Sequence, residues 1–121
     1  MKDHIVIQGE RNSGKTTFAN KFAALLYEDQ EILRFDFSKL TYSYIIQRNF
    51  KIKIVDECPD ANTILALASY SDGWKAETDE EYIVVYVTQA DCSALPESRF
   101  RIIQCSYSAS REEYIVEPLT T

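Results

Sequence analysis

The fold is decided by the stretch GERNSGKT at residues 9–16, which consists of Gly9, Glu10, Arg11, Asn12, Ser13, Gly14, Lys15 and Thr16. A short hydrophobic run at residues 4–7 precedes it and predicts a buried strand. An amphipathic helix is predicted directly after it, over residues 16–27, because Phe18, Phe22 and Leu25 recur at helical spacing. The local pattern is therefore a strand, a loop bounded by two glycines, and a helix.

This pattern matches the Walker A motif, Gly-x4-Gly-Lys-Thr, in the strand–helix context that supports it. Glycines let the loop turn its backbone N–H groups inward, and the start of the helix adds further donors for an anion. Lys15 is expected to reach the β and γ phosphates, and the Thr16 hydroxyl is expected to bind Mg²⁺. With Thr17 included, residues 9–17 are the predicted nucleotide-binding residues, for ATP or GTP. We take ATP and Mg²⁺ as the expected ligands.

The rest of the chain alternates between strand-like and helix-like segments. Strands are predicted at residues 32–37, 51–55, 82–87 and 99–105. Helices are predicted over residues 39–48, with Ser38 as the N-cap, and over residues 61–69, which Pro59 and Asp60 open. A break at residues 71–73 and a polar loop at 74–80 are expected to follow. Residues 109–121 are either a last edge strand or a docked tail.

This alternation predicts an α/β fold with a mainly parallel five-stranded sheet and helices on both faces. Together with the loop it indicates the three-layer P-loop NTPase fold. The 121 residues suit a single nucleotide-binding domain over residues 1–121.

Composition limits the classes of function. A net charge of −6 argues against direct nucleic-acid binding by this chain alone, because such binding depends on clustered Lys and Arg. No apolar run approaches the roughly 20 residues that a membrane-spanning helix needs, and the start of the sequence does not resemble a signal peptide. No membrane association is therefore predicted. Three widely spaced cysteines and a single histidine form neither a zinc site nor a disulfide framework. A reducing, cytoplasmic location is therefore expected.

A pair of carboxylates follows the predicted third strand. Asp56 stands where it could hold Mg²⁺, and Glu57 stands where it could orient or deprotonate an attacking water. The pair is a weak signal alone and a stronger one downstream of a phosphate-binding loop.

Residues 9–16, Asp56-Glu57 and Val87-Thr88-Gln89 together resemble the additional-strand, catalytic-glutamate class of P-loop ATPases, and most of all the AAA+ domains and superfamily-three helicases. The resemblance implies that Gln89, or Thr88 beside it, is the sensor-one residue. It also implies that Arg99 acts as an arginine finger on a neighbouring subunit. The expected catalytic residues are therefore Lys15, Glu57, Gln89 and Arg99.

The resemblance covers most of residues 4–105, with only the Walker A motif highly specific, and the helical lid of AAA+ proteins is expected to be absent. Three alternative functions remain open. The first is an ATPase without a lid domain. The second is a P-loop kinase for a nucleoside or small molecule, in which Asp36 binds the acceptor hydroxyl, and the third is a nucleotide-controlled binding module with little turnover. Beyond nucleotide, the expected partners are a second copy of the chain or a larger protein.

Overall fold

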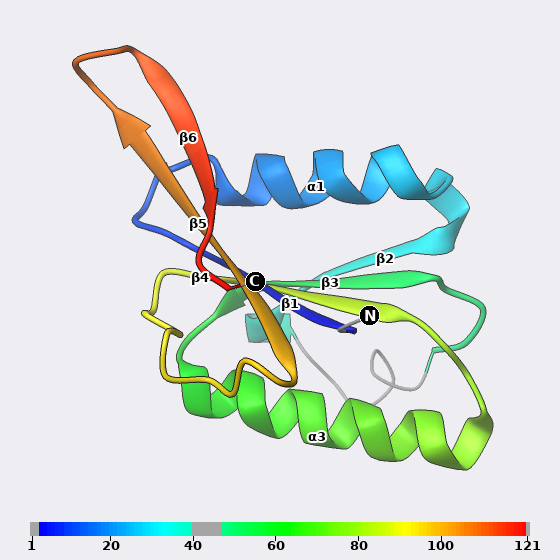
Figure 1. The fold of residues 1–121 in the computed structure, drawn as a ribbon. Helices are drawn as coiled ribbons and strands as arrows, with labels where there is room; N and C mark the ends of the chain where they lie inside the picture. The colour runs from blue at the N-terminus through cyan, green and yellow to red at the C-terminus, as the bar shows by residue number, and fades with distance from the viewer. Residues whose placement is uncertain (1–2, 40–46, 121) are drawn as a thin grey trace.

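In a computed structural model that describes residues 3–39 and 47–120, the chain forms a six-stranded sheet with one long helix on each face (Figure 1). The strands are β1 His4–Gln8, β2 Ile32–Asp36, β3 Ile52–Cys58, β4 Ile83–Thr88, β5 Phe100–Ser108 and β6 Glu113–Pro118. Their order across the sheet is β2-β3-β4-β1-β5-β6, and β1 to β5 run parallel to one another. β6 pairs antiparallel with β5.

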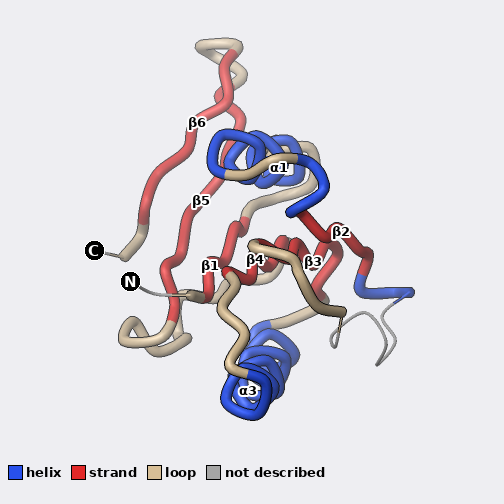
Figure 2. The backbone as a smooth tube through the Cα atoms, turned by 90° about the vertical axis from the view of Figure 1, so that its right-hand side faces the viewer, coloured by secondary structure: helices blue, strands red, loops and turns tan. Residues whose placement is uncertain are grey.

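The two long helices lie on opposite sides of the sheet (Figure 2). α1 spans Lys15–Leu26 and buries Ala19 and Ala23, whereas α3 spans Ala61–Thr78 and buries Ile64, Ala68 and Ser71. Short 3-10 helices at Asp29–Glu31 and Phe37–Lys39 flank β2. Since β1 has helices over both faces, all five of its residues are buried, as expected of a central parallel strand.

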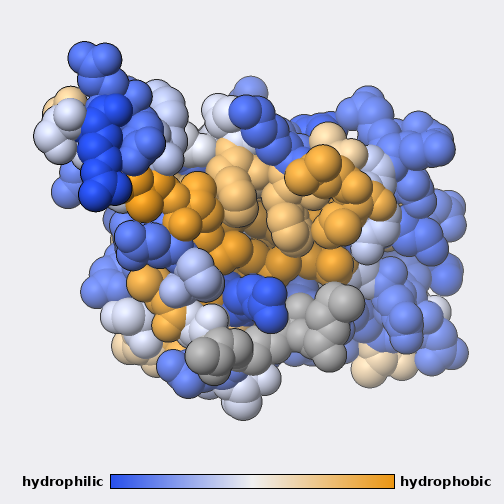
Figure 3. Space-filling model, turned by 45° about the horizontal axis from the view of Figure 1, so that its top comes forward, coloured by the Kyte–Doolittle hydropathy of each residue, from blue (hydrophilic) through white to orange (hydrophobic). Residues whose placement is uncertain are grey.

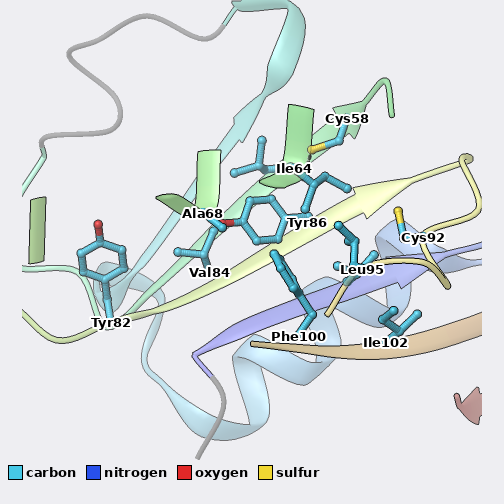
Figure 4. Close-up of a cluster of buried hydrophobic side chains, with 12 residues drawn as sticks. Cys58, Ile64, Ala68, Tyr82, Val84, Tyr86, Cys92, Leu95, Phe100 and Ile102 are labelled. Atoms are coloured by element: carbon cyan, nitrogen blue, oxygen red, sulfur yellow. Dashed lines mark hydrogen bonds between the residues drawn. The ribbon is translucent and has the colours of Figure 1, made fainter. Parts of the chain in front are cut away.

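The core beneath α3 is built around two large aromatic side chains. Tyr86 of β4 and Phe100 of β5 are fully buried and lie between the sheet and Ile64 and Ala68 of the helix (Figure 4). The Tyr86 hydroxyl has a hydrogen-bond partner in His4 Nδ1 at 3.0 Å, so this buried polar group is satisfied. These contacts link β1, β4 and β5 beneath the helix.

The core beneath α1 is buried, but apolar side chains outside it remain exposed on the same side of the molecule. Figure 3, which turns the α1 side towards the viewer, shows a continuous patch of hydrophobic atoms. Leu25 is 86 % exposed and Leu26 is 53 % exposed at the end of α1, and Val116 of β6 is also exposed. Apolar surface on this side of the molecule is therefore contributed by the end of α1 and by the edge strand β6.

The predicted break in the second long helix is wrong. α3 continues through Gly73 to Thr78, and residues 74–78 of the predicted polar loop are helical. Asp60 caps the start as predicted, accepting a hydrogen bond from Thr63 N at 2.7 Å. Near the other end, Ser71 Oγ lies 2.8 Å from Tyr82 Oη, and Trp74 packs against the core. These tertiary contacts offset the helix cost of a glycine, which is about 1 kcal/mol.

The predicted sheet of five strands is also corrected, because the described chain adds β6 as an antiparallel edge strand. This resolves the alternatives left open for the C-terminal segment. β3 extends to Cys58 and so includes both carboxylates, with a register irregularity between Val55 and Cys58. The helix predicted over residues 39–48 falls mainly on residues 40–46, which lie outside the described residues. In the ranges 3–39 and 47–120, no helix has the length and hydrophobicity needed to cross a bilayer.

Candidate functional site

Residues 9–14 connect β1 to α1 at the carboxyl edge of the parallel sheet, and Lys15 and Thr16 are the first residues of the helix. Gly14 has a φ of 82° and Asn12 a φ of 63°, so the chain reverses direction through left-handed backbone just before the helix. Gly9 N donates to Thr88 O of the neighbouring strand β4 at 3.2 Å. Lys15 Nζ donates to Glu10 O at 3.0 Å, which folds the ammonium back over the loop. The loop therefore presents a cation and the free N–H groups of a helix start to the same space.

Gly9 allows the loop to pass very close to β5. A Cβ placed on Gly9 would lie 2.3 Å from Cys105 O, a backbone atom, and 2.6 Å from Ser13 Oγ. Ser13 is 4 % exposed, and its hydroxyl has no hydrogen-bond partner in the described structure. The first glycine of the motif is thus required by close packing of the loop against the sheet.

Thr16 and Asp56 meet although 40 residues separate them in the sequence. Thr16 Oγ1 lies 3.1 Å from Asp56 Oδ2 and 3.3 Å from Asp56 Oδ1. α1 begins above the end of β3, so the first turn of the helix brings the hydroxyl to the carboxylate. The two side chains that were predicted from separate motifs to bind Mg²⁺ therefore lie within hydrogen-bond distance of each other.

Glu57 occupies an unusual backbone conformation at this same edge. Its φ of 59° lies in the left-handed region, which a residue with a Cβ adopts at a cost of about 1–2 kcal/mol. The irregularity in the β3–β4 pairing falls here, and Glu57 N donates to Asp56 Oδ1 at 2.8 Å. Strain of this kind concentrates at functional sites. At this irregularity Glu57 is exposed, whereas Asp56 is half-buried.

A cavity of about 510 Å³ opens over the loop. This volume is in the range of small-molecule sites, about 300–1,000 Å³. Its walls come from the loop, the start of α1, the ends of β3 and β4, and β6, through Arg11, Asn12, Gly14, Lys15, Thr16, Thr17, Glu57, Gln89 and Tyr114. A smaller recess of about 250 Å³ includes Lys15, Asp56, Glu57 and Gln89.

The two candidates for the sensor position differ in their surroundings. Thr88 is 1 % exposed, and its hydroxyl donates to Cys58 O at 2.7 Å while accepting from Ala90 N at 3.0 Å. Gln89 is exposed and lines both the larger cavity and the recess. Of the two, Gln89 is the side chain available to a ligand, and Thr88 joins β3 to β4.

Arg99 lies away from the loop. It directly precedes Phe100, which pairs with His4 at the amino end of β1, whereas the loop follows the carboxyl end. Arg99 Nη2 donates to Asp72 Oδ2 at 2.9 Å, and Asp72 Oδ1 lies 2.8 Å from His4 Nε2. Arg99 therefore does not contribute to the cavity of its own chain.

Two further carboxylates and a thiol lie near the carboxyl edge of the sheet or the loop. Asp36, the acceptor-binding residue of the kinase hypothesis, accepts hydrogen bonds from Ser38 N and Ser38 Oγ at 2.8 and 2.7 Å and holds the turn after β2. Glu10 is exposed beside the loop. Burial raises the pKa of the Cys58 thiol to about 12, with the Asp56 charge adding to the effect, so this cysteine stays protonated.

Sequence reasoning missed Tyr114. It lines the cavity from β6, about 100 residues after the loop, and its ring lies against Gly14. The hydrophobic alternation of residues 114–116 favoured a strand but said nothing of where that strand would lie.

Comparison with known proteins supports the fold, through one solved structure, and finds no related sequence. No family model and no curated protein sequence matches the chain. Among solved structures, the flagellar accessory protein FlaH from Methanocaldococcus jannaschii is similar, with a TM-score of 0.53 and 12 % sequence identity, over 98 % of this chain and 78 % of that chain. At this identity the similarity concerns the fold. The chain therefore has a mixed, mostly parallel α/β fold that a known protein shares.

Proposed function

We propose that this chain is a P-loop protein of the three-layer type that binds ATP and hydrolyses it with the help of Mg²⁺, as a minimal core related to the AAA+ and helicase-like ATPases. One observation carries the proposal: the Thr16 hydroxyl lies 3.1 Å from the Asp56 carboxylate, beside Lys15, at the edge of a cavity large enough for a nucleotide. The fold shared with a known protein is consistent with this arrangement.

The loop would bind the phosphates through residues 9–17. Lys15 exchanges its bond to Glu10 O for the β and γ phosphate oxygens, and the N–H groups at the start of α1 donate to the same anion. Glycine at position 14 supports the turn that directs those groups, with its φ of 82°. Binding therefore needs no rearrangement of the sheet.

Thr16 and Asp56 have the chemistry needed to hold a magnesium ion. Mg²⁺ prefers oxygen ligands and is usually held by one or two protein groups together with substrate phosphates and water. Thr16 Oγ1 and the carboxylate of Asp56 supply such oxygens from one place. When bound there, Mg²⁺ would neutralise phosphate charge during transfer.

Glu57 would act as the general base. Its carboxylate is exposed at the cavity and is not the group that holds Thr16, so it is free to accept a proton from a water directed at the γ-phosphate. Gln89, on the wall of the same recess, would hold that water or a phosphate oxygen by its amide. The products are ADP and inorganic phosphate.

Phosphate release from ATP–Mg²⁺ tests the proposal. Glu57→Gln should lower the rate at least about 100-fold while ATP binding survives, because a positioned base contributes about 10²–10⁴. Glu77→Gln, which changes an exposed carboxylate on α3, is the matched control and should leave the rate unchanged. An unaltered rate in Glu57→Gln would remove Glu57 from the mechanism, and transfer to an added nucleoside would favour a kinase.

A second candidate function is nucleotide-controlled binding of another chain, with little turnover. The exposed Leu25 and Leu26 at the end of α1 favour it. In such an assembly Arg99 would act on the nucleotide of a neighbouring copy. Light scattering with and without ATP–Mg²⁺, beside an assay of phosphate release, tests this: nucleotide should increase the mass while release stays slow. If the assembly instead hydrolyses ATP, Arg99→Ala should lose hydrolysis without losing binding. A mass that never changes would contradict assembly.

A further inference from the structure

The β5–β6 hairpin reaches further along the molecule than the other strands. β5 continues four residues past Gln104, the residue that pairs with the last residue of β1, and β6 returns antiparallel to it. We call residues 106–115 the arm. It passes beside the start of α1 in both views of the backbone (Figures 1 and 2). The arm is therefore attached to the sheet but projects over the loop at residues 9–16.

Tyr114 is the residue by which the arm meets the loop. A Cβ placed on Gly14 would lie 3.0 Å from Tyr114 Cδ1 and 3.3 Å from Cε1, so the ring rests against the backbone of the second glycine. On its strand side Tyr114 pairs with Tyr107, at a ring-centroid distance of 5.0 Å and an interplanar angle of 54°. This tilted arrangement is favourable for aromatic pairs. The ring of Tyr114 is thus positioned by two contacts.

Despite those contacts, Tyr114 is 63 % exposed. It is the aromatic member of the cavity wall, and the other lining residues are polar or glycine. A phosphate chain needs none of this aromatic surface, whereas a nucleobase stacks on it readily. The cavity therefore has a polar part suited to phosphates and an aromatic part suited to a flat ring.

The order of the strands determines which end of a ligand meets which part. β1 and its loop lie between β4 and β5. On one side, Gln89 follows β4 and the two carboxylates lie near the end of β3; on the other side, Tyr114 lies on β6. With the phosphates over Lys15 and Thr16, a ligand whose terminal phosphate points to Glu57 has its opposite end directed to the arm.

We infer that Tyr114 is the nucleobase platform of this site, so that the base of a bound nucleotide stacks on its ring. The inference rests on the proposed function, since it assumes a nucleotide on the loop. It goes further by assigning recognition of the base to the C-terminal hairpin. Tripolyphosphate, which has the phosphates but neither base nor sugar, should bind the loop without using Tyr114.

Binding constants for ATP–Mg²⁺ and tripolyphosphate–Mg²⁺, measured by titration calorimetry on the full chain, test the inference. Tyr114→Ala should weaken ATP about tenfold or more and leave tripolyphosphate within about twofold, because losing a base stack has an effect of that size. Tyr114→Phe should keep the wild-type affinity, since stacking needs only the ring. Val116→Ala changes an exposed apolar residue further along β6 and should change neither constant.

Two results would overturn the inference. Tyr114→Ala could retain full ATP affinity, or it could lose ATP and tripolyphosphate equally, which would make the ring a support for Gly14 alone. Lys15→Ala separates this failure from failure of the proposed function. It should weaken both ligands, and if it weakens neither, or wild type binds neither, the phosphate site itself is refuted.

A spectroscopic measurement gives an independent readout. Tyr114→Trp should show a fluorescence change on adding ATP that tripolyphosphate does not produce. The wild-type protein supplies the background from Trp74, which packs on the other face of the sheet. Equal fluorescence responses to the two ligands would contradict stacking.

Discussion

Gly9→Ala is the substitution whose effect follows most directly from the structure. The new Cβ would lie 2.3 Å from Cys105 O, about 1 Å short of ordinary contact, and that oxygen belongs to the backbone of β5. It cannot rotate away, because β5 is held between β1 and β6. Overpacking of this kind costs about 1–3 kcal/mol. At about 4 °C per kcal/mol for a chain of this length, the melting temperature should fall by about 4–12 °C.

Gly73→Ala is the matched control for that experiment. Gly73 lies in α3, and a Cβ there would have no heavy atom within 4 Å. Replacing a helix glycine with alanine stabilises by about 0.5–1 kcal/mol, so the melting temperature should rise by about 2–4 °C. Thermal unfolding followed by circular dichroism measures both variants. If Gly9→Ala melts at or above the wild-type temperature, the loop does not pass β5 as closely as described.

Two further predictions concern backbone strain and pH. Glu57→Gly should be about 1 kcal/mol more stable than Glu57→Ala, because only glycine accepts a φ of 59° without cost; urea unfolding measures the difference, and the reverse order, normal in a strand, would refute the strain. Burial lowers the pKa of His4, against the opposing effect of Asp72, so the unfolded chain takes up this proton first as the pH falls. Stability from neutral His4 should therefore be complete above pH 6.5 and decrease below it, and melting between pH 7 and 5 should be less pH-dependent in His4→Asn; an unchanged dependence would contradict this.

The local parts of the site could be predicted from the sequence. Residues 4–16 determine the strand, the turn and the start of the helix by short-range physics: hydrophobic patterning, glycine at the turn and helix propensity. Asp56 and Glu57 follow a hydrophobic strand, and the carboxyl ends of parallel strands share one edge of a sheet. The contact between Asp56 and Thr16 follows because the helix also starts at that edge, directly after the loop.

Features that depend on distant contacts were not predictable in the same way. Gly73 and the polar residues around it indicate a break, and the helix continues because Ser71 and Trp74 contact residues beyond its end. The left-handed conformation of Glu57 arises from the irregular pairing of β3 with β4, and no glycine signals it. Tyr114 reaches Gly14 only through the β5–β6 pairing, whose position a six-residue strand does not reveal.

The central claim, that residues 9–17 bind the phosphates of a nucleotide, is tested most directly by titrating ATP–Mg²⁺ into the wild-type protein and Lys15→Ala. We predict saturable binding to a single site in wild type and at least about tenfold weaker binding in Lys15→Ala, because a charge-assisted contact to phosphate contributes about 1.5–3 kcal/mol. Unchanged circular dichroism spectra would show that the variant is folded. Absence of binding in wild type, or equal affinity in the two proteins, would contradict the claim.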